Sequence, residues 1–267
     1  MQVGPYVLEG VLGQGGMGTV HRARHVLLHT PVALKQLTLQ DPAARALFVE
    51  EARMLFGRKH PCFPTVLDLM EEQGHSWLVM DLIEGPTLSS VLQHALLTAS
   101  EASGLGVGLC QALTYLHGCG LLHRDIKPDN ILLPRGLTHP VLVDLGIAGR
   151  VGGGAAVAFT PGMAPPEQEA GGTCIPASDV YQVGATLHCA LTGLPPTPGR
   201  PPDTTLGASC VSHPGLVQAI AAALRADVNQ RPNSARAMQT LLEAAAVTSS
   251  APAPPVPVRR GVMDIRR

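Results

Sequence analysis

The sequence predicts an α+β protein with two lobes. Residues 6–40, 65–71 and 76–82 carry the alternation of polar and apolar side chains that is typical of β-strands. After residue 87, apolar residues recur mainly at helical spacing. Because strands come first and helices follow, the pattern favours a β-rich lobe joined to a helical lobe, with residues 81–86 as the connection.

Each lobe has further expected elements. In the first lobe, Asp41 is a good N-cap and Pro42 suits the first helical position, so we expect a helix over residues 42–57. The helices expected in the second lobe cover residues 88–97, 101–118, 176–191, 216–224 and 236–247. Short strands are expected at 131–133 and 141–143, and the Pro- and Ala-rich residues 248–258 read as a disordered linker.

Composition excludes several classes of protein. The 267 residues are 45% hydrophobic, which is enough for a sizeable core, and the net charge of −1 gives no indication of nucleic acid or of an anionic membrane. The six cysteines lack the spacing of a zinc site and are expected to be buried thiols in a reducing compartment. With no signal-peptide pattern and no apolar run long enough to span a bilayer, we expect a cytoplasmic protein without a membrane span.

A glycine cluster, LGQGGMGTV, follows the first expected strand. Gly13, Gly15 and Gly18 have the spacing G-x-G-x-x-G, which two unrelated folds use to hold nucleotide phosphates. In a dinucleotide-binding unit the glycines lead from a strand into a helix, whereas in the other fold they lead into a second strand. A plain flexible hairpin is the third interpretation.

The residues after the glycines decide against the dinucleotide-binding unit. They alternate as a strand does, and Pro31 would interrupt a crossover helix. No acidic residue lies about 20 residues further on, where a ribose would need one. A hairpin that covers phosphates, or a plain hairpin, remains.

Lys35 ends the strand pattern VALK, in which Ala33 and Lys35 share one face. An inward lysine needs an anion, whereas a surface lysine would extend its charge into water. The chain has 16 arginines and only three lysines, so a retained lysine indicates that a compact ammonium is required. Glu51 lies on the apolar stripe of the expected helix and could pair with Lys35, although in isolation it would read as a solvated residue.

The most specific signal is HRDIKPDN at residues 123–130, with Asp144 located 14 residues after Asn130. Asp125 could accept or orient the proton of a hydroxyl, and Lys127 could neutralise a phosphoryl group during its transfer. Asn130 and Asp144 supply the oxygen ligands that Mg²⁺ prefers. This combination is hard to explain as a solvated loop.

With these motifs, the sequence resembles the bacterial eukaryotic-like (Hanks-type) serine/threonine protein kinases from about residue 6 to residue 245. The resemblance implies a two-lobed protein-kinase fold, with a five-stranded small lobe containing one key helix, a larger helical lobe, and ATP between them. It divides the chain into an N-lobe (1–81), a hinge (82–86), a C-lobe (87–247) and a tail (248–267).

The resemblance also assigns the nucleotide site. Lys35, paired with Glu51, would hold the α- and β-phosphates, and Met80 would be the gatekeeper beside the adenine. Asn130 and Asp144 would bind the metal, Mg²⁺ with Mn²⁺ as an alternative. The expected nucleotide contacts are Leu12, Gly13, Gly15, Gly16, Gly18, Val20, Ala33, Lys35, Met80, Asp81, Ile83 and Leu132.

Catalytic and structural roles follow in the same way. Asp125 would be the catalytic base, supported by Lys127, whose position marks the serine/threonine type. Thr160 would tie the substrate-docking segment to the catalytic loop. Asp179 would anchor that loop from a buried helix, and Glu167 and Arg231 would form a structural ion pair.

Two departures from the family pattern concern the segment after Asp144. The metal motif reads Asp-Leu-Gly rather than Asp-Phe-Gly, and Leu is a tolerated apolar substitute. The following segment, IAGRVGGGAAVAFTPGMAPP, has no Ser or Tyr, and its one Thr is Thr160. In relatives that are activated by loop phosphorylation, the arginine equivalent to Arg124 binds the phosphate. We therefore hypothesise that this chain does not need loop phosphorylation.

The implied function is Mg²⁺-dependent transfer of the γ-phosphoryl group of ATP to Ser and Thr hydroxyls of proteins, including autophosphorylation. The alternatives are a catalytically inactive binding module on the same fold and a small-molecule phosphotransferase on a related fold. The first would have lost a catalytic group, and the second would generally lack the docking residues Thr160 and Glu167.

Overall fold

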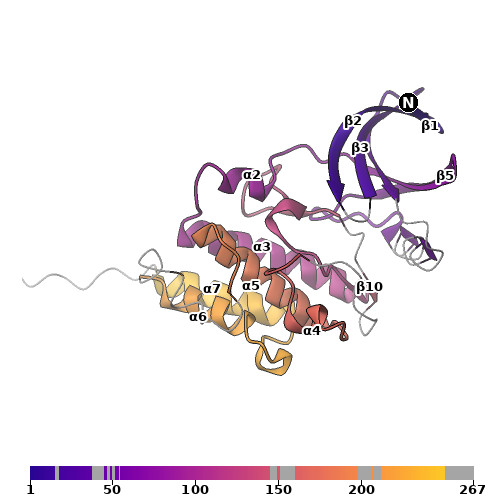
Figure 1. The fold of residues 1–267 in the computed structure, drawn as a ribbon. Helices are drawn as coiled ribbons and strands as arrows, with labels where there is room; N and C mark the ends of the chain where they lie inside the picture. Colours follow the sequence, from indigo (N-terminus) through magenta and orange to yellow (C-terminus); the bar gives the residue numbers. More distant parts are fainter. Residues whose placement is uncertain are drawn as a thin grey trace, which may run out of the picture.

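The computed structural model describes residues 1–15, 18–37, 45–46, 49, 52–53, 55–144, 149–150, 160–197, 206 and 212–249. A curled β-sheet forms one end of the molecule, and helices α3 to α7 form the other (Figure 1). The helix expected over 42–57, with Glu51 on it, falls largely outside the described residues, as do Gly16 and the tail beyond Ser249.

The N-terminal sheet has six strands in the order β1-β2-β3-β4-β6-β5, and every neighbouring pair is antiparallel. The strands are β1 (Gln2–Val3), β2 (Tyr6–Gly15), β3 (Gly18–His25), β4 (Pro31–Leu37), β5 (Val66–Glu72) and β6 (His75–Asp81). The sheet therefore has one strand more than the family resemblance implies. The additional strand, β1, has only two residues, too few to show an alternation in the sequence.

The glycine cluster lies at the turn between β2 and β3, where Gly15 pairs with Gly18. A strand rather than a helix follows the glycines, so the exclusion of a dinucleotide-binding unit is confirmed. Gly18 is required by its surroundings, because a Cβ atom there would lie 2.0 Å from the carbonyl oxygen of Gln36. The hairpin thus lies directly beside β4, the strand that carries Lys35.

The two faces of the sheet have different environments. Trp77, Leu34 and Val79 are buried in the core of the small lobe, with Val3, Tyr6, Ala23 and Val32. Because side chains alternate along a strand, Lys35 on β4 points away from that core. Its side chain is nevertheless only 5% exposed, since it faces the second lobe.

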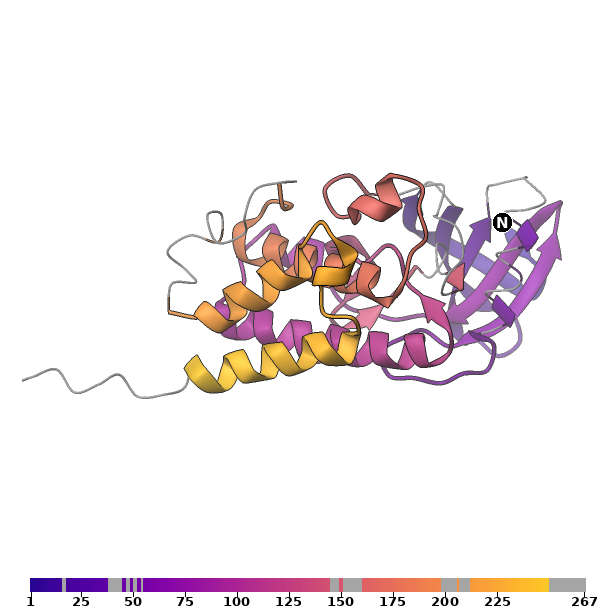
Figure 2. The same ribbon diagram turned by 90° about the horizontal axis from the view of Figure 1, so that it is seen from below.

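The second lobe is helical, and α3 runs beneath α5 with α7 beside it (Figure 2). Its helices are α2 (Leu88–Leu92), α3 (Ala99–Gly118), α4 (Pro166–Glu169), α5 (Pro176–Thr192), α6 (Pro214–Ala223) and α7 (Ala235–Ser249). A single apolar core joins α3, α5, α6 and α7. Among the described residues, no helix is both long enough and apolar enough to cross a membrane.

The first expected helix of this lobe is shorter than its pattern indicates. The prediction of a helix over 88–97 was wrong beyond Leu92. The N–H of Leu97 donates to the carbonyl of Ala190 on α5, and Thr98 then caps α3 in a reciprocal capping box with Glu101. That cap also explains why α3 begins at Ala99, two residues before the expected position.

Short strands frame the loop that carries HRDIKPDN. The loop leaves β7 (Leu121–Leu122), passes through the 3₁₀ turn η1 (Pro128–Asn130) and enters β8 (Ile131–Leu132). β8 pairs with β9 (Val141–Leu142), as expected for the runs 131–133 and 141–143, while β7 pairs with β10 (Gly149–Arg150). The loop is thereby fixed at both ends.

Candidate active site

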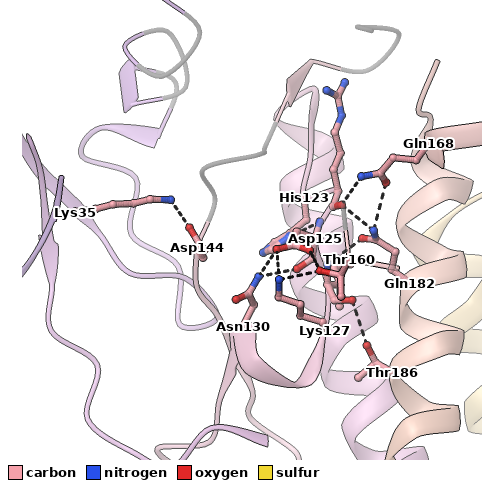
Figure 3. A network of polar contacts seen from close by, with 12 residues as sticks. Lys35, His123, Asp125, Lys127, Asn130, Asp144, Thr160, Gln168, Gln182 and Thr186 are labelled. Atoms are coloured by element: carbon pink, nitrogen blue, oxygen red, sulfur yellow. Dashed lines mark hydrogen bonds and ion pairs between the residues drawn. The ribbon is translucent and has the colours of Figure 1, made fainter. Parts of the chain in front are cut away.

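Asp125 lies at the centre of a dense polar network (Figure 3). Its Oδ2 atom lies 2.8 Å from the ammonium of Lys127 and accepts a hydrogen bond of 2.8 Å from the side-chain amide of Asn130. Its Oδ1 atom accepts a hydrogen bond of 3.1 Å from the hydroxyl of Thr160. The residue is only 5% exposed, so these contacts fix the direction of the carboxylate.

Lys127 and Thr160 join the loop to the segment before α4. The ammonium of Lys127 donates to the Thr160 hydroxyl at 2.9 Å, in addition to its contact with Asp125. Asp125, Lys127 and Thr160 thus contact one another, although 35 residues separate Asp125 from Thr160. This is the link between loop and docking segment that the family resemblance implies.

Asn130 brings Asp144 close to this network. The backbone N–H of Val143 donates to the carbonyl of Asn130 at 3.0 Å, which places the next residue, Asp144, beside the loop. The side-chain amide nitrogen of Asn130 donates to the backbone carbonyl and to the carboxylate of Asp125. Its amide oxygen is therefore the atom that can act as a ligand.

Asp144 forms an ion pair with Lys35 of β4, so one contact connects the two lobes (Figure 3). Burial raises the pKa of the Asp144 carboxyl, but the neighbouring Lys35 ammonium outweighs this effect and holds the pKa below its ordinary value. Asp144 also has a φ of +62°, a conformation that is uncommon for a residue other than glycine. The expected pair of Lys35 with Glu51 lies outside the described residues.

The donor set of Asn130 and Asp144 fits a divalent cation such as Mg²⁺. An amide oxygen and a carboxylate are hard oxygen ligands, and Mg²⁺ is commonly held by one or two carboxylates together with substrate phosphates. The backbone hydrogen bond from Val143 to Asn130 keeps the backbone before Asp144 beside Asn130. The chemistry of these residues is thus compatible with the metal that the sequence indicates.

The positions expected around the nucleotide base are distributed over both lobes. Met80 of β6 pairs with Ala33 of β4, and Gly13 of β2 pairs with Val20 of β3. Leu132 lies on β8, in the opposite lobe. The other described positions expected at the nucleotide, Leu12, Gly15 and Gly18, lie in the β2–β3 hairpin, and Ile83 follows β6.

Asp81 is bound to Thr65 through both its backbone and its side chain. Its backbone N–H donates to the carbonyl of Thr65, and its carboxylate accepts from the N–H of the same residue. Adenine recognition by the Asp81 backbone would therefore depend on its carbonyl group.

Asp179 supports the loop from α5. It is completely buried and accepts hydrogen bonds from the N–H groups of His123 and Arg124, at 2.9 and 2.8 Å. The imidazole of His117 lies 2.8 Å from the same carboxylate. Burial raises the pKa of Asp179, but these hydrogen bonds and the nearby His117 prevail and lower it.

Glu167 and Arg231 form a two-pronged ion pair, with N–O distances of 2.7 and 2.8 Å. The Arg231 side chain has no solvent exposure and also lies over the ring of Tyr181. Ser178 of α5 donates to Glu167, so the pair connects α4, α5 and the segment before α7. Burial opposes the ionisation of Glu167, but Arg231 outweighs it and lowers the pKa.

Sequence reasoning missed several residues that contact the catalytic loop or its anchor, among them Thr186, which lies 3.4 Å from the carbonyl of Ile126. His117 contacts Asp179, and Gln168 and Gln182 both donate to the carbonyl of Arg124. Gln182 had a signal in the sequence, since it follows Asp179 by three residues and therefore shares its face of the helix. Gln168 offered no such pattern.

Comparisons with known proteins agree with this geometry. The model of the family "Protein kinase domain" matches residues 6–247. Serine/threonine-protein kinase PknH of Mycobacterium tuberculosis (strain H37Rv) is 36% identical over 203 residues, which are 72% of this chain and 32% of PknH. Serine/threonine-protein kinase PknB of Mycobacterium leprae is 35% identical over 212 residues, covering 74% of this chain and 34% of PknB.

Among solved structures, the PknI kinase domain of Mycobacterium tuberculosis is similar, with a TM-score of 0.76 and 27% identity. The match covers 92% of this chain and 98% of that domain. The chain spans about a third of the length of the curated relatives that it matches, whereas it spans nearly all of the solved domain.

Proposed function

Because the chain belongs to the protein kinase family, we propose that it transfers the γ-phosphoryl group of ATP to Ser and Thr hydroxyls of proteins, including its own. The observation that carries this proposal is the group of contacts around Asp125. A carboxylate fixed by Lys127, Asn130 and Thr160 lies next to an Asp144–Lys35 pair from the other side of the site. These contacts support a proton acceptor at Asp125 and a phosphate site at Lys35 and Asp144.

Asp125 is the group we assign to the acceptor hydroxyl. Its carboxylate is directed by Asn130 and Thr160, so it can orient the hydroxyl and accept its proton as the new P–O bond forms. Lys127, 2.8 Å from Asp125, can neutralise charge on the phosphoryl oxygens. Thr160 connects this pair to the substrate-docking segment, which favours a protein acceptor over a small alcohol.

Lys35, Asn130 and Asp144 are the groups we assign to the phosphates and the metal. In the structure Lys35 and Asp144 bind each other, so each is already oriented for a ligand of opposite charge. Mg²⁺, or Mn²⁺ in its place, would neutralise the phosphate oxygens when bound by Asn130 and Asp144. The β2–β3 hairpin, through its glycines, allows backbone N–H groups to approach the phosphates.

The partners follow from the same chemistry. We propose protein substrates with Ser or Thr acceptors, and no nucleic acid. We propose the cytoplasm as the compartment, and the free thiols of the described cysteines, Cys62, Cys110, Cys119, Cys174 and Cys189, are compatible with it.

Activity should not require phosphorylation of the segment between Asp144 and Thr160. This proposal rests on the sequence of the segment, which contains no Ser, Tyr or further Thr. A preparation freed of phosphate by a phosphatase should start phosphorylating a protein substrate without a lag. A loop phosphosite whose removal abolishes activity, other than Thr160 itself, would contradict it.

The assigned roles are tested with Asp125→Asn and Asp144→Asn. Asp125→Asn should bind ATP as the wild type does and lose about 10²- to 10⁴-fold in kcat, because only proton transfer and orientation are removed. Asp144→Asn, in contrast, should lower kcat and also weaken Mg²⁺-dependent ATP binding. Retained turnover in Asp125→Asn would contradict the role of Asp125, and label on small alcohols instead of proteins would favour a small-molecule phosphotransferase.

A further inference from the structure

We propose that Gln182 of α5 and Gln168 of α4 are positioning residues for the catalytic loop. The two buried amides bind the loop backbone on both sides of Asp125 and hold its carboxylate in the direction needed for phosphoryl transfer. The inference rests on the proposed function, since it assumes that Asp125 receives the acceptor hydroxyl.

α5 presents a polar stripe to the loop. Asp179, Gln182 and Thr186 are spaced by three and four residues and therefore share one face of the helix. Asp179 accepts from the N–H groups of His123 and Arg124, and Thr186 lies 3.4 Å from the carbonyl of Ile126. Gln182, between them, both accepts and donates, so it can bind two different backbone groups at once (Figure 3).

The two groups bound by Gln182 flank Asp125. Its side-chain oxygen accepts from the N–H of Ile126 at 2.9 Å, and its nitrogen donates to the carbonyl of Arg124 at 2.7 Å. Gln168 donates to that same carbonyl at 3.0 Å, and the two glutamine side chains lie 3.3 Å apart. Both peptide groups of Asp125 are thus held by side chains from other elements.

The bound carbonyl belongs to a residue with an unusual backbone conformation. Arg124 has a φ of +66°, in the left-handed region that residues with a side chain rarely adopt. Such a conformation persists only where the surroundings impose it. Asp179 holds the N–H of Arg124 and the two glutamines hold its carbonyl, so α4 and α5 together impose this turn on the loop.

Burial makes these contacts hard to replace. Gln168 is 1% exposed and Gln182 is 2% exposed, so the loop groups that they bind have little access to bulk water. If Gln182 is replaced by an apolar side chain of similar length, the N–H of Ile126 loses its glutamine acceptor, and the carbonyl of Arg124 loses one of the two glutamine amides that donate to it. The loop should then relax at Asp125 while the helices stay folded.

The test uses three variants: Gln182→Met, Gln168→Met and the double variant that carries both substitutions. Val183→Ala is the control. Val183 is a fully buried core residue on the same helix, so Val183→Ala lowers stability without removing a hydrogen bond to the loop. We expect Gln182→Met to lower kcat by about 10- to 100-fold with little change in the KM for ATP, because a misdirected carboxylate slows transfer but not nucleotide binding. Gln168→Met should have a smaller effect, since Gln182 remains bound to Arg124, and Val183→Ala should keep its kcat.

A second readout does not depend on activity. In Gln182→Met, the backbone N–H of Ile126 should exchange with deuterium about tenfold faster or more than in the wild type, while that of Arg124, bound by Asp179, should change much less. If kcat and the exchange of Ile126 both match the wild type, or if Val183→Ala loses kcat to the same extent, the inference is wrong. If the wild type transfers no phosphate, the proposed function fails, and the exchange of Ile126 alone then decides whether Gln182 holds the loop.

Discussion

Lys35 lies on a β-strand and Asp144 on a loop 109 residues later, yet their side chains form an ion pair across the site. Each of them binds a different part of a metal–nucleotide complex in our proposal. The pair therefore keeps two groups of opposite charge in place and partly desolvated before a ligand arrives. At the scale of single residues, this preorganisation is visible in the lowered pKa of Asp144.

Replacing Lys35 by Met should raise the pKa of Asp144. Burial raises this pKa by itself, and the Lys35 ammonium is the main influence that lowers it, so its removal leaves burial less opposed. The measurement is a carboxyl ¹³C NMR titration of Asp144. Lys59→Met removes an exposed lysine and should leave the Asp144 titration unchanged. An unchanged pKa in Lys35→Met would show that the pair does not form in solution.

At the scale of elements, the sequence predicted what depends on local patterns. The strand after Gly18 was predicted from the alternation of its side chains. The start of α5 was predicted from Pro176, which is its first residue. The shortened α2 could not be predicted, because its end depends on a bond from Leu97 to Ala190, far along the chain. The two-residue strands β7 and β10 are too short to have a periodicity.

In the candidate site, too, local motifs could be predicted from the sequence, whereas contacts between residues far apart in the chain could not. Asp125, Lys127 and Asn130 were found because they are close together in a recognisable motif. The role of Gln182 depends on the carbonyl of Arg124, 58 residues earlier, which no local spacing reveals. Only the packing of α5 against the loop brings these groups together.

The connection between β8 and β9 packs closely on α3 at Gly108, which gives a prediction for this element. A Cβ atom at Gly108 would lie 2.5 Å from Cδ of Pro140 and 2.9 Å from the carbonyl oxygen of Thr138. Gly108→Ala should therefore destabilise the protein, by about 1–3 kcal/mol in urea-induced unfolding, because a backbone segment must move.

Gly118, the last residue of α3, is the matched control, since nothing lies within 4 Å of the Cβ position there. Gly118→Ala should stabilise the protein by about 0.4–1 kcal/mol through the entropy of the unfolded chain. Equal effects of the two substitutions would show that the contact of the β8–β9 connection with α3 is not close.

At the scale of the whole molecule, the carboxylates of Asp179 and Glu167 connect the segments of the helical lobe. Asp179 joins α5 to the catalytic loop and to His117 of α3, and Glu167 joins α4 to Arg231 before α7. Both carboxyl groups have a pKa below the ordinary value, so the unfolded chain binds more protons than the folded one on acidification. Their contribution to stability is complete above the ordinary carboxyl pKa and is lost as the pH falls through the lowered pKa of the folded state.

Glu167→Gln tests this coupling to pH. At neutral pH it should lower the free energy of unfolding by about 3–5 kcal/mol, because the Arg231 guanidinium stays buried without its counter-charge. From about pH 5 to pH 3, its stability should fall less steeply than that of the wild type, since one titrating carboxylate is gone. Glu169→Gln removes an exposed carboxylate of α4 instead and is the control for the loss of one negative charge. If the free energy of unfolding falls with pH equally steeply in the wild type, Glu167→Gln and Glu169→Gln, Glu167 does not titrate with a lowered pKa.

The proposal that this chain is a serine/threonine kinase is tested most directly by identifying the amino acid that receives the phosphate. The purified protein is incubated with Mg²⁺, γ-labelled ATP and a generic protein substrate, with Asp125→Asn in parallel, and the labelled residues are identified after hydrolysis. Our account predicts phosphoserine and phosphothreonine with the wild type and nearly none with Asp125→Asn. Absence of protein-bound label from a folded, ATP-binding wild type, or equal labelling by Asp125→Asn, would contradict it.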